Sequence, residues 1–212
     1  MVYSLHMNPL SLLAFLPFTL FNPQIDPAFD FAAPKTAIYL TSQTVANQNG
    51  ADNEDKFAKL GGNTIIFDVQ DSKGKIAYPS QVPVSQKIGN YKSQIKDLSA
   101  QVKDLHDRGF YVVARMVLIK NPFLAAKKPE WTIKKRGTKS PFVSRDGPVW
   151  LDPGNPELKE YLTDIGREIA AAGVDEIQFD YVRFPEGGRG GYVGYNFTGD
   201  DKFSRDQVIT NF

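Results

Sequence analysis

The sequence lacks cysteine and has only two histidines, His6 and His106. Disulfide frameworks, cysteine-ligated zinc, iron–sulfur clusters and thiol nucleophiles are therefore excluded, and a polyhistidine metal site is disfavoured. An excess of one charge is also missing, because 25 Lys and Arg residues face 24 Asp and Glu residues, for a net charge of +1. Since duplex nucleic acid requires a basic surface, we expect no nucleic-acid partner.

An apolar run occurs near the N-terminus, but it is short for a membrane span. Leu10 to Phe21 (LSLLAFLPFTLF) is uncharged, whereas a span takes about 20 residues. Its length fits the apolar core of a signal peptide, although no Lys or Arg precedes it and no small-residue cleavage site follows directly. We expect residues 1–34 to be a signal- or anchor-like leader with a Pro-rich linker, and residues 35–212 to form the folded domain. An extracytoplasmic protein, secreted or tethered through residues 10–21, is the expectation, and a loosely packed extension is the alternative.

Strand and helix signals alternate through the rest of the chain. The pattern predicts strands at 37–41, 64–70, 111–119 and 176–184, and helices at 52–60, 88–106 and 155–172. Asn155-Pro156-Glu157 has the residue types of a helix start, with an Asn cap, Pro at the first position and an acid in the first turn. Strand–helix–strand units of this length predict a parallel sheet in an α/β fold.

The choice among parallel α/β folds depends on glycine and on polar strand residues. No G-x-G-x-x-G follows the first strand and no P-loop occurs, which disfavours nucleotide-binding folds. The pleat places one set of residues on one face of the predicted sheet: Tyr39, Asp68, Arg115 and Asp180. Phe179 and Tyr181 are then expected to face the helices. Polar groups near the carboxyl ends of strands are typical of a (β/α)₈ TIM barrel, which keeps its chemistry there.

Other residues have two interpretations each. Asp68 and Asp180 are either site carboxylates or structural partners of Arg115 and Arg183. Asp152 either lines the mouth of the barrel or holds the turn before the helix. Asp68, Asp71 and Asp180 could together bind Mg or Ca, but their spacing does not require it, so no metal and no cofactor are expected. His106 is expected to complement its helix dipole, residues 120–152 to form a loop that shapes a cleft, and Gly187–Gly191 to form a flexible loop. The aromatic residues that could stack on sugars are Tyr39, Trp131, Trp150, Tyr181 and Phe184.

Residues 175–185 (DEIQFDYVRFP) resemble the signature of the DUF4015 family of bacterial glycoside hydrolases. Further segments that are similar to the family are KTAIYLT from Lys35, NTIIFDVQD from Asn63, VPVSQKIG from Val82, GFYVVARMVLIK from Gly109 and WLDPGNPE from Trp150. The resemblance implies a TIM barrel of the glycosidase superfamily, a polysaccharide or cell-envelope glycan as substrate and two-carboxylate chemistry. Asp180 is then the nucleophile or base, and Asp68 binds a substrate hydroxyl or is the second carboxylate. Substrate-binding candidates are Arg183, Arg115, Tyr39, Asp152, Trp150 and Tyr181.

The length conflicts with a whole barrel, which takes about 250 residues. Only four strands are predicted, and Ser204 to Phe212 has the pattern of a helix start after the fourth. We therefore expect about the first four βα units, with the general acid in the other half and little activity from these residues alone. Two alternatives stay open: a non-catalytic carbohydrate-binding or envelope domain, and a metal-dependent barrel enzyme. Nothing in the pattern indicates an oligomeric state.

Overall fold

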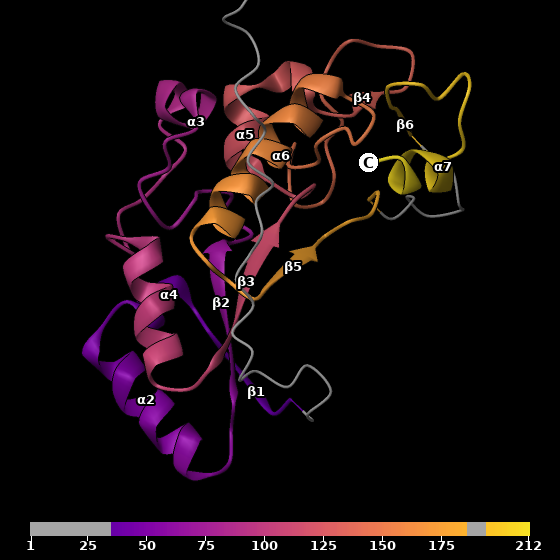
Figure 1. The fold of residues 1–212 in the computed structure, drawn as a ribbon. Helices are drawn as coiled ribbons and strands as arrows, with labels where there is room; N and C mark the ends of the chain where they lie inside the picture. The colour runs from indigo at the N-terminus through magenta and orange to yellow at the C-terminus, as the bar shows by residue number, and fades with distance from the viewer. Residues whose placement is uncertain (1–34, 186–193) are drawn as a thin grey trace, which may run out of the picture.

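A parallel four-stranded sheet organises the computed structural model, which describes residues 35–185 and 194–212 (Figure 1). The order in the sheet is β1-β2-β3-β5, so the strands of this sheet lie side by side in the order in which they occur along the chain. The strands are β1 (Ala37–Leu40), β2 (Thr64–Gln70), β3 (Tyr111–Val117) and β5 (Glu176–Asp180). The predicted leader and the Gly187–Gly191 loop lie outside the described residues.

Helical segments connect successive strands of the sheet, as the alternating pattern predicted. The connections carry α1 (Ser42–Val45) and α2 (Gln48–Lys59), then α3 (Pro83–Ile88) and α4 (Leu98–Asp107), then α5 (Pro122–Lys127) and α6 (Pro156–Ala171). A short 3-10 helix η1 (Pro129–Trp131) follows α5, and α7 (Arg205–Thr210) follows β5. The predicted start of α6 is confirmed, because the Asn155 side chain accepts a hydrogen bond from the Leu158 N–H at 3.0 Å.

The hydrophobic core lies on the face of the sheet that was predicted to face the helices, opposite Asp68 and Arg115. Ile65, Phe67, Val112, Ala114 and Met116 are completely buried there. The apolar faces of α4 and α6 join the same core through Leu98, Val102, Leu105, Leu158, Ile165 and Ile169. Polar residues of the strands are therefore left on the opposite face.

The predicted helix at 88–106 is wrong over its first half. Gly89 ends α3 in the left-handed region with φ 66°, and α4 begins only after Asp97, whose carboxylate caps the N–H of Ala100. Between them the chain is not helical and hydrogen-bonds to the segment after β2, since the Ile95 N–H donates to the Ala77 carbonyl at 2.9 Å. Tertiary pairing therefore replaces the helix here, although Ile95 is as buried as the spacing required.

Other boundaries differ by a few residues. β3 ends at Val117 rather than 119, β5 ends at Asp180 rather than 184, and α2 begins at Gln48 rather than 52. Residues 120–152 contain α5, η1 and β4 (Lys134–Lys135) rather than a plain loop. β4 pairs antiparallel with β6 (Tyr195–Asn196), and Figure 1 shows this pair and α7 beyond the arrowhead of β5.

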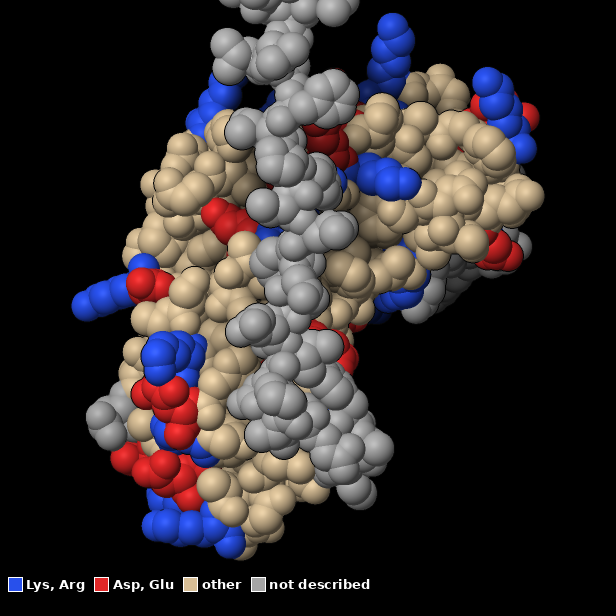
Figure 2. Space-filling view, viewed as in Figure 1, with Lys and Arg blue, Asp and Glu red and all other residues tan. Residues whose placement is uncertain are grey.

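Charges of both signs are mixed on the face in Figure 2. Ion pairs between α2 and α4 and within α4 are an example: Arg108 donates to Asp55 at 2.8 Å and also pairs with Glu54, and Lys103 pairs with Asp107. Among the described helices, none combines the length and the apolar character that crossing a membrane would require.

Candidate active site

Four side chains from four adjacent strands form one hydrogen-bonded network. Arg115 on β3 donates from Nη1 to Asp68 Oδ1 on β2 at 2.6 Å, and from Nε to Asp180 Oδ2 on β5 at 3.0 Å. Its Nη2 also donates to Asp180 Oδ2, and the Tyr39 hydroxyl on β1 donates to Asp68 Oδ2. The sheet places these residues together because Asp68 and Arg115 are register partners, and Asp180 ends the strand on the other side of β3. The structure thus brings together all four residues that the pleat assigned to one face.

The two carboxylates of this network differ in exposure. Asp68 is 4% exposed, whereas the side chain of Asp180 is 41% exposed. The Arg115 side chain lies between them and is 19% exposed. Asp180 is therefore the carboxylate that a ligand can reach.

The electrostatics of the network keep Asp180 ionised and Tyr39 neutral. Partial burial acts to raise the pKa of Asp180, but hydrogen bonds from Arg115 and the Tyr181 N–H, with the charges of Arg115 and Arg183, lower this pKa below its usual value. Burial and the hydrogen bond to Asp68 raise the pKa of Tyr39 to about 12. Burial acts to lower the pKa of Arg115, but its bonds to the two carboxylates raise that pKa overall.

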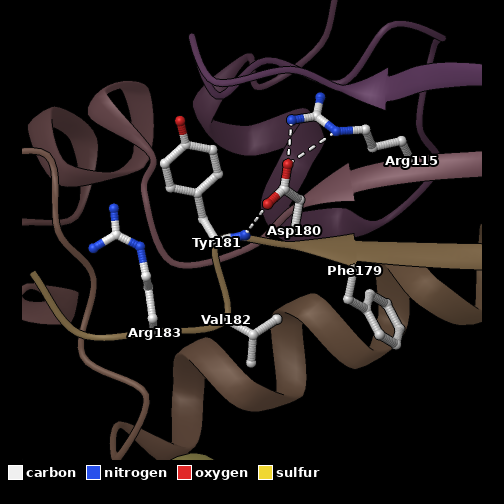
Figure 3. A pocket seen from close by; sticks show the side chains of 6 residues that line it. All are labelled: Arg115, Phe179, Asp180, Tyr181, Val182 and Arg183. Atoms are coloured by element: carbon white, nitrogen blue, oxygen red, sulfur yellow. Dashed lines mark hydrogen bonds and ion pairs between the residues drawn. The ribbon is translucent and has the colours of Figure 1, made fainter. Parts of the chain in front are cut away.

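Tyr181 follows Asp180 in an unusual backbone conformation. Its φ is 55°, and it is the one non-glycine residue in the described chain with positive φ. Its N–H donates to Asp180 Oδ1 at 2.6 Å, and its ring lies on the Asp180 side of the strand (Figure 3). The expectation that Tyr181 faces the helices is therefore wrong, because β5 ends at Asp180 and the strand alternation ends with it. Backbone strain of this kind concentrates at functional sites.

A cavity of about 450 Å³ opens at the end of β5. Its lining residues are Arg115, Phe179, Asp180, Tyr181, Val182 and Arg183 (Figure 3). Phe179 points away from Asp180, toward the side of the helices as expected, but on this edge strand of the described sheet it is 54% exposed (Figure 3). Asp180 is the only carboxylate among the lining residues that the structure describes.

Aromatic rings and cations stack beside this cavity. The Arg183 guanidinium lies 5.1 Å from the Trp150 ring centre and 5.8 Å from that of Tyr181. The Lys120 Nζ lies 5.3 Å from the centre of the Tyr181 ring and pairs with Asp146 Oδ2 at 2.8 Å. Lys120 was missed as a neighbour of the site, although its position just after β3 was an available signal.

Asp152 lies apart from the network, in a turn. Its Oδ1 accepts from the Gly154 N–H at 2.9 Å, and its Oδ2 accepts from the Thr198 N–H and hydroxyl, both at 2.7 Å. Burial raises the pKa of Asp152 more than these bonds lower it. Its geometry matches the structural interpretation, in which it holds the turn before Asn155. Asp152 and Thr198 also line a second, open cavity of about 550 Å³.

The remaining aromatic and histidine candidates from the sequence pack against neighbouring side chains. Trp131 and Trp150 are almost fully buried, as is Phe184, which stacks on Tyr195 with ring centres 5.8 Å apart. His106 lies in the last turn of α4 and contacts Asp175 at 2.8 Å. Among residues 35–185 and 194–212, no group of three or more acidic or histidine side chains could hold a metal ion. For the proposed Asp68–Asp71–Asp180 set the reason is local, because the Arg115 guanidinium bonds to both Asp68 and Asp180.

A parallel βα sheet that carries an ionised carboxylate and paired cations at the carboxyl end of its strands defines an α/β protein with an enzyme-like site. The chain belongs to the DUF4015 family, described as a "putative glycosyl hydrolase domain", whose model matches residues 37–212. The family resemblance drawn from the sequence is thereby confirmed, and with it a glycoside-hydrolase-like family.

Solved structures agree on the fold. A hypothetical protein from Ruminiclostridium thermocellum ATCC 27405 is 31% identical, with a TM-score of 0.73, over 82% of this chain and 87% of that chain. An uncharacterized protein from Listeria monocytogenes EGD-e, in complex with α-D-glucose, β-D-glucose, magnesium and calcium, is 14% identical with a TM-score of 0.51. That match covers 82% of this chain but 18% of the Listeria chain, and it bears on the fold alone. No curated protein matches the chain significantly.

Proposed function

We propose that the protein is a glycoside hydrolase in which Asp180 is the nucleophile or the general base. The observation that carries the proposal is the state of Asp180: it is reachable from the cavity, and Arg115 and the Tyr181 N–H lower its pKa. A carboxylate that is ionised at neutral pH can attack an anomeric carbon or activate a water, but it is unsuited to donate a proton to the leaving group.

The general acid would be a second carboxyl group with a raised pKa. Burial raises the pKa of Glu54 and of Asp152, but neither lines the Asp180 cavity. The proposal therefore assigns no general acid among the described residues. The fold of this proposal is of the (β/α)₈ type, which the parallel β1-β2-β3-β5 sheet supports.

The substrate of this proposal is a polysaccharide or cell-envelope glycan, and the setting is extracytoplasmic. The family description supports the substrate class, and the ring of Tyr181, on the same side of the strand as Asp180, offers an apolar face on which a sugar can stack (Figure 3). The setting rests on the apolar run at residues 10–21.

The test is the rate at which reducing ends are released from a panel of polysaccharides and 4-nitrophenyl glycosides. Asp180→Asn should lower kcat at least about a hundredfold while binding of the glycan is largely retained. The matched control is Asp164→Asn, which removes an α6 carboxylate paired only with nearby Arg167. Equal turnover by Asp180→Asn and the control would refute the assignment.

A non-catalytic carbohydrate-binding domain is the second candidate. It is favoured by the presence of a single carboxylate among the described residues that line the cavity. In that case the protein binds a glycan by equilibrium titration, releases no reducing ends from it, and Asp180→Asn changes no turnover because there is none.

A further inference from the structure

Asp68 lies beneath Arg115 and not in the cavity. It is 4% exposed and is absent from the residues that line the cavity. Both of its oxygens are already occupied, Oδ1 by Arg115 Nη1 at 2.6 Å and Oδ2 by the Tyr39 hydroxyl. A sugar hydroxyl or an anomeric carbon would have to displace Arg115 or the Tyr39 hydroxyl to reach this carboxylate.

We propose that Asp68 and Tyr39 are positioning residues, which act on Asp180 through Arg115, and that Asp68 is not the second reacting carboxylate. The inference rests on the proposed function only for its kinetic consequence; the geometry stands without it. It separates the two residues that the sequence assigned to catalysis: Asp180 touches the substrate and Asp68 does not.

The planar guanidinium group of Arg115 couples the two carboxylates. Its five N–H groups lie in one plane at fixed angles, so holding one nitrogen fixes the directions of the others. Asp68 holds Nη1, and the directions left for Nε and Nη2 lead to Asp180 Oδ2. Without Asp68, Arg115 could rotate about its terminal bonds and donate to Asp180 in other geometries.

Tyr39 completes the same arrangement from β1. Its hydroxyl donates to Asp68 Oδ2, and its ring centre lies 5.8 Å from the Arg115 guanidinium carbon. Because this hydroxyl stays protonated at neutral pH, it remains a donor and restricts the Asp68 carboxylate to one orientation. Each of the four strands thus contributes one member, and Asp180 is the member that faces the ligand.

The first measurement needs no substrate. In the ¹⁵N-labelled protein, NMR exchange spectroscopy gives the rate of rotation about the Nε–Cζ bond of Arg115, assigned with Arg115→Lys. We expect slow rotation in the wild type, rotation at least tenfold faster in Asp68→Asn, and a smaller acceleration, about threefold, in Tyr39→Phe. The control Asp164→Asn should match the wild type. Unchanged rotation in Asp68→Asn overturns the proposal, and if that variant fails to fold, Tyr39→Phe decides it by the same criterion.

The second measurement separates kcat from KM on a glycan that the wild type hydrolyses. A positioning role predicts that Asp68→Asn lowers kcat tenfold or more and changes KM less than twofold. A KM raised tenfold at constant kcat would overturn the proposal and make Asp68 a substrate ligand. Loss of turnover as complete as in Asp180→Asn, with unchanged Arg115 rotation, would overturn it and make Asp68 a reacting carboxylate. If Asp180→Asn itself keeps full activity, the proposed function fails, and the rotation measurement still decides the positioning role.

Discussion

Replacement of Arg115 by Met tests whether the network stabilises the fold as the geometry requires. Met keeps an unbranched apolar side chain but removes the cation that bonds to both carboxylates. Asp68 is then left as a buried carboxylate with the Tyr39 hydroxyl as its one remaining side-chain partner among the described contacts. Breaking a buried ion pair from one side costs about 3–5 kcal/mol.

The lower end of that range applies here. The Asp180 side chain is 41% exposed and can be rehydrated, so the cost comes mainly from Asp68. We therefore expect the free energy of unfolding to fall by about 3 kcal/mol at pH 7. For a domain of this size, that loss lowers Tm by roughly 6–12 °C.

The assay is urea denaturation of both proteins at several pH values. In the wild type, Arg115 helps to lower the pKa of Asp180, so protonation of Asp180 in acid removes part of what this ion pair contributes. The difference between the two proteins should therefore shrink as the pH falls toward about 3. Adding Asp68→Asn to the Arg115→Met variant should restore part of the stability, because it removes the unpaired charge.

An exposed ion pair provides the comparison. Arg167, whose side chain is 74% exposed, pairs with Asp164 on α6, and Arg167→Met should cost less than about 0.5 kcal/mol. A cost below about 1 kcal/mol for Arg115→Met, or a cost independent of pH, would refute the reasoning, because a buried carboxylate cannot lose its cation so cheaply.

Three further predictions concern single carboxyl groups. Because the folded-state pKa of Asp180 is lowered, its stabilising contribution is present above the unfolded pKa of about 3.9 and is lost as the pH falls through the folded pKa. Asp180→Asn should therefore be less stable than the wild type at pH 7. A difference in urea midpoint between the two proteins that persists undiminished at pH 2 would contradict this. Asp152→Ala removes the acceptor for three hydrogen bonds to Gly154 and Thr198 and should cost about 2 kcal/mol without changing KM, whereas a raised KM would place Asp152 in the substrate site. Glu168→Ala leaves the Tyr78 and Ser80 hydroxyls and a backbone N–H without their acceptor and should lower the free energy of unfolding by about 3 kcal/mol, measured beside Glu168→Gln, which should cost less.

The strands and the polar face of the sheet could be predicted because the pleat is a local rule. Alternation in β2 and β3 placed Asp68 and Arg115 on one face, and parallel pairing then made them neighbours. Alternation did not predict the exposure of Phe179 on the edge strand or the side on which Tyr181 lies, where β5 has ended and a non-glycine residue is left-handed. Neither is determined by residue spacing.

The helix predicted at 88–106 failed for a different reason. Ile95 fits a helical face, but it is buried in a non-helical segment whose backbone hydrogen-bonds to Ala77. Gly89 and Asp97 were local signals for a helix end and a helix start, and they outweigh the spacing. The difference in solvent exposure between Asp68 and Asp180 was also unpredictable, because the two side chains are identical and only the cover given by their neighbours differs.

The backbone conformation of Tyr181 links the Asp180 carboxylate to the cavity-lining residues that follow it. The same peptide unit that turns the backbone out of the sheet also donates to Asp180, and the next residues carry Val182 and Arg183 along the cavity wall. A ligand that displaces this wall would pull on one oxygen of the carboxylate while Arg115 holds the other. Binding of the ligand would then also change the orientation of the Asp180 carboxylate.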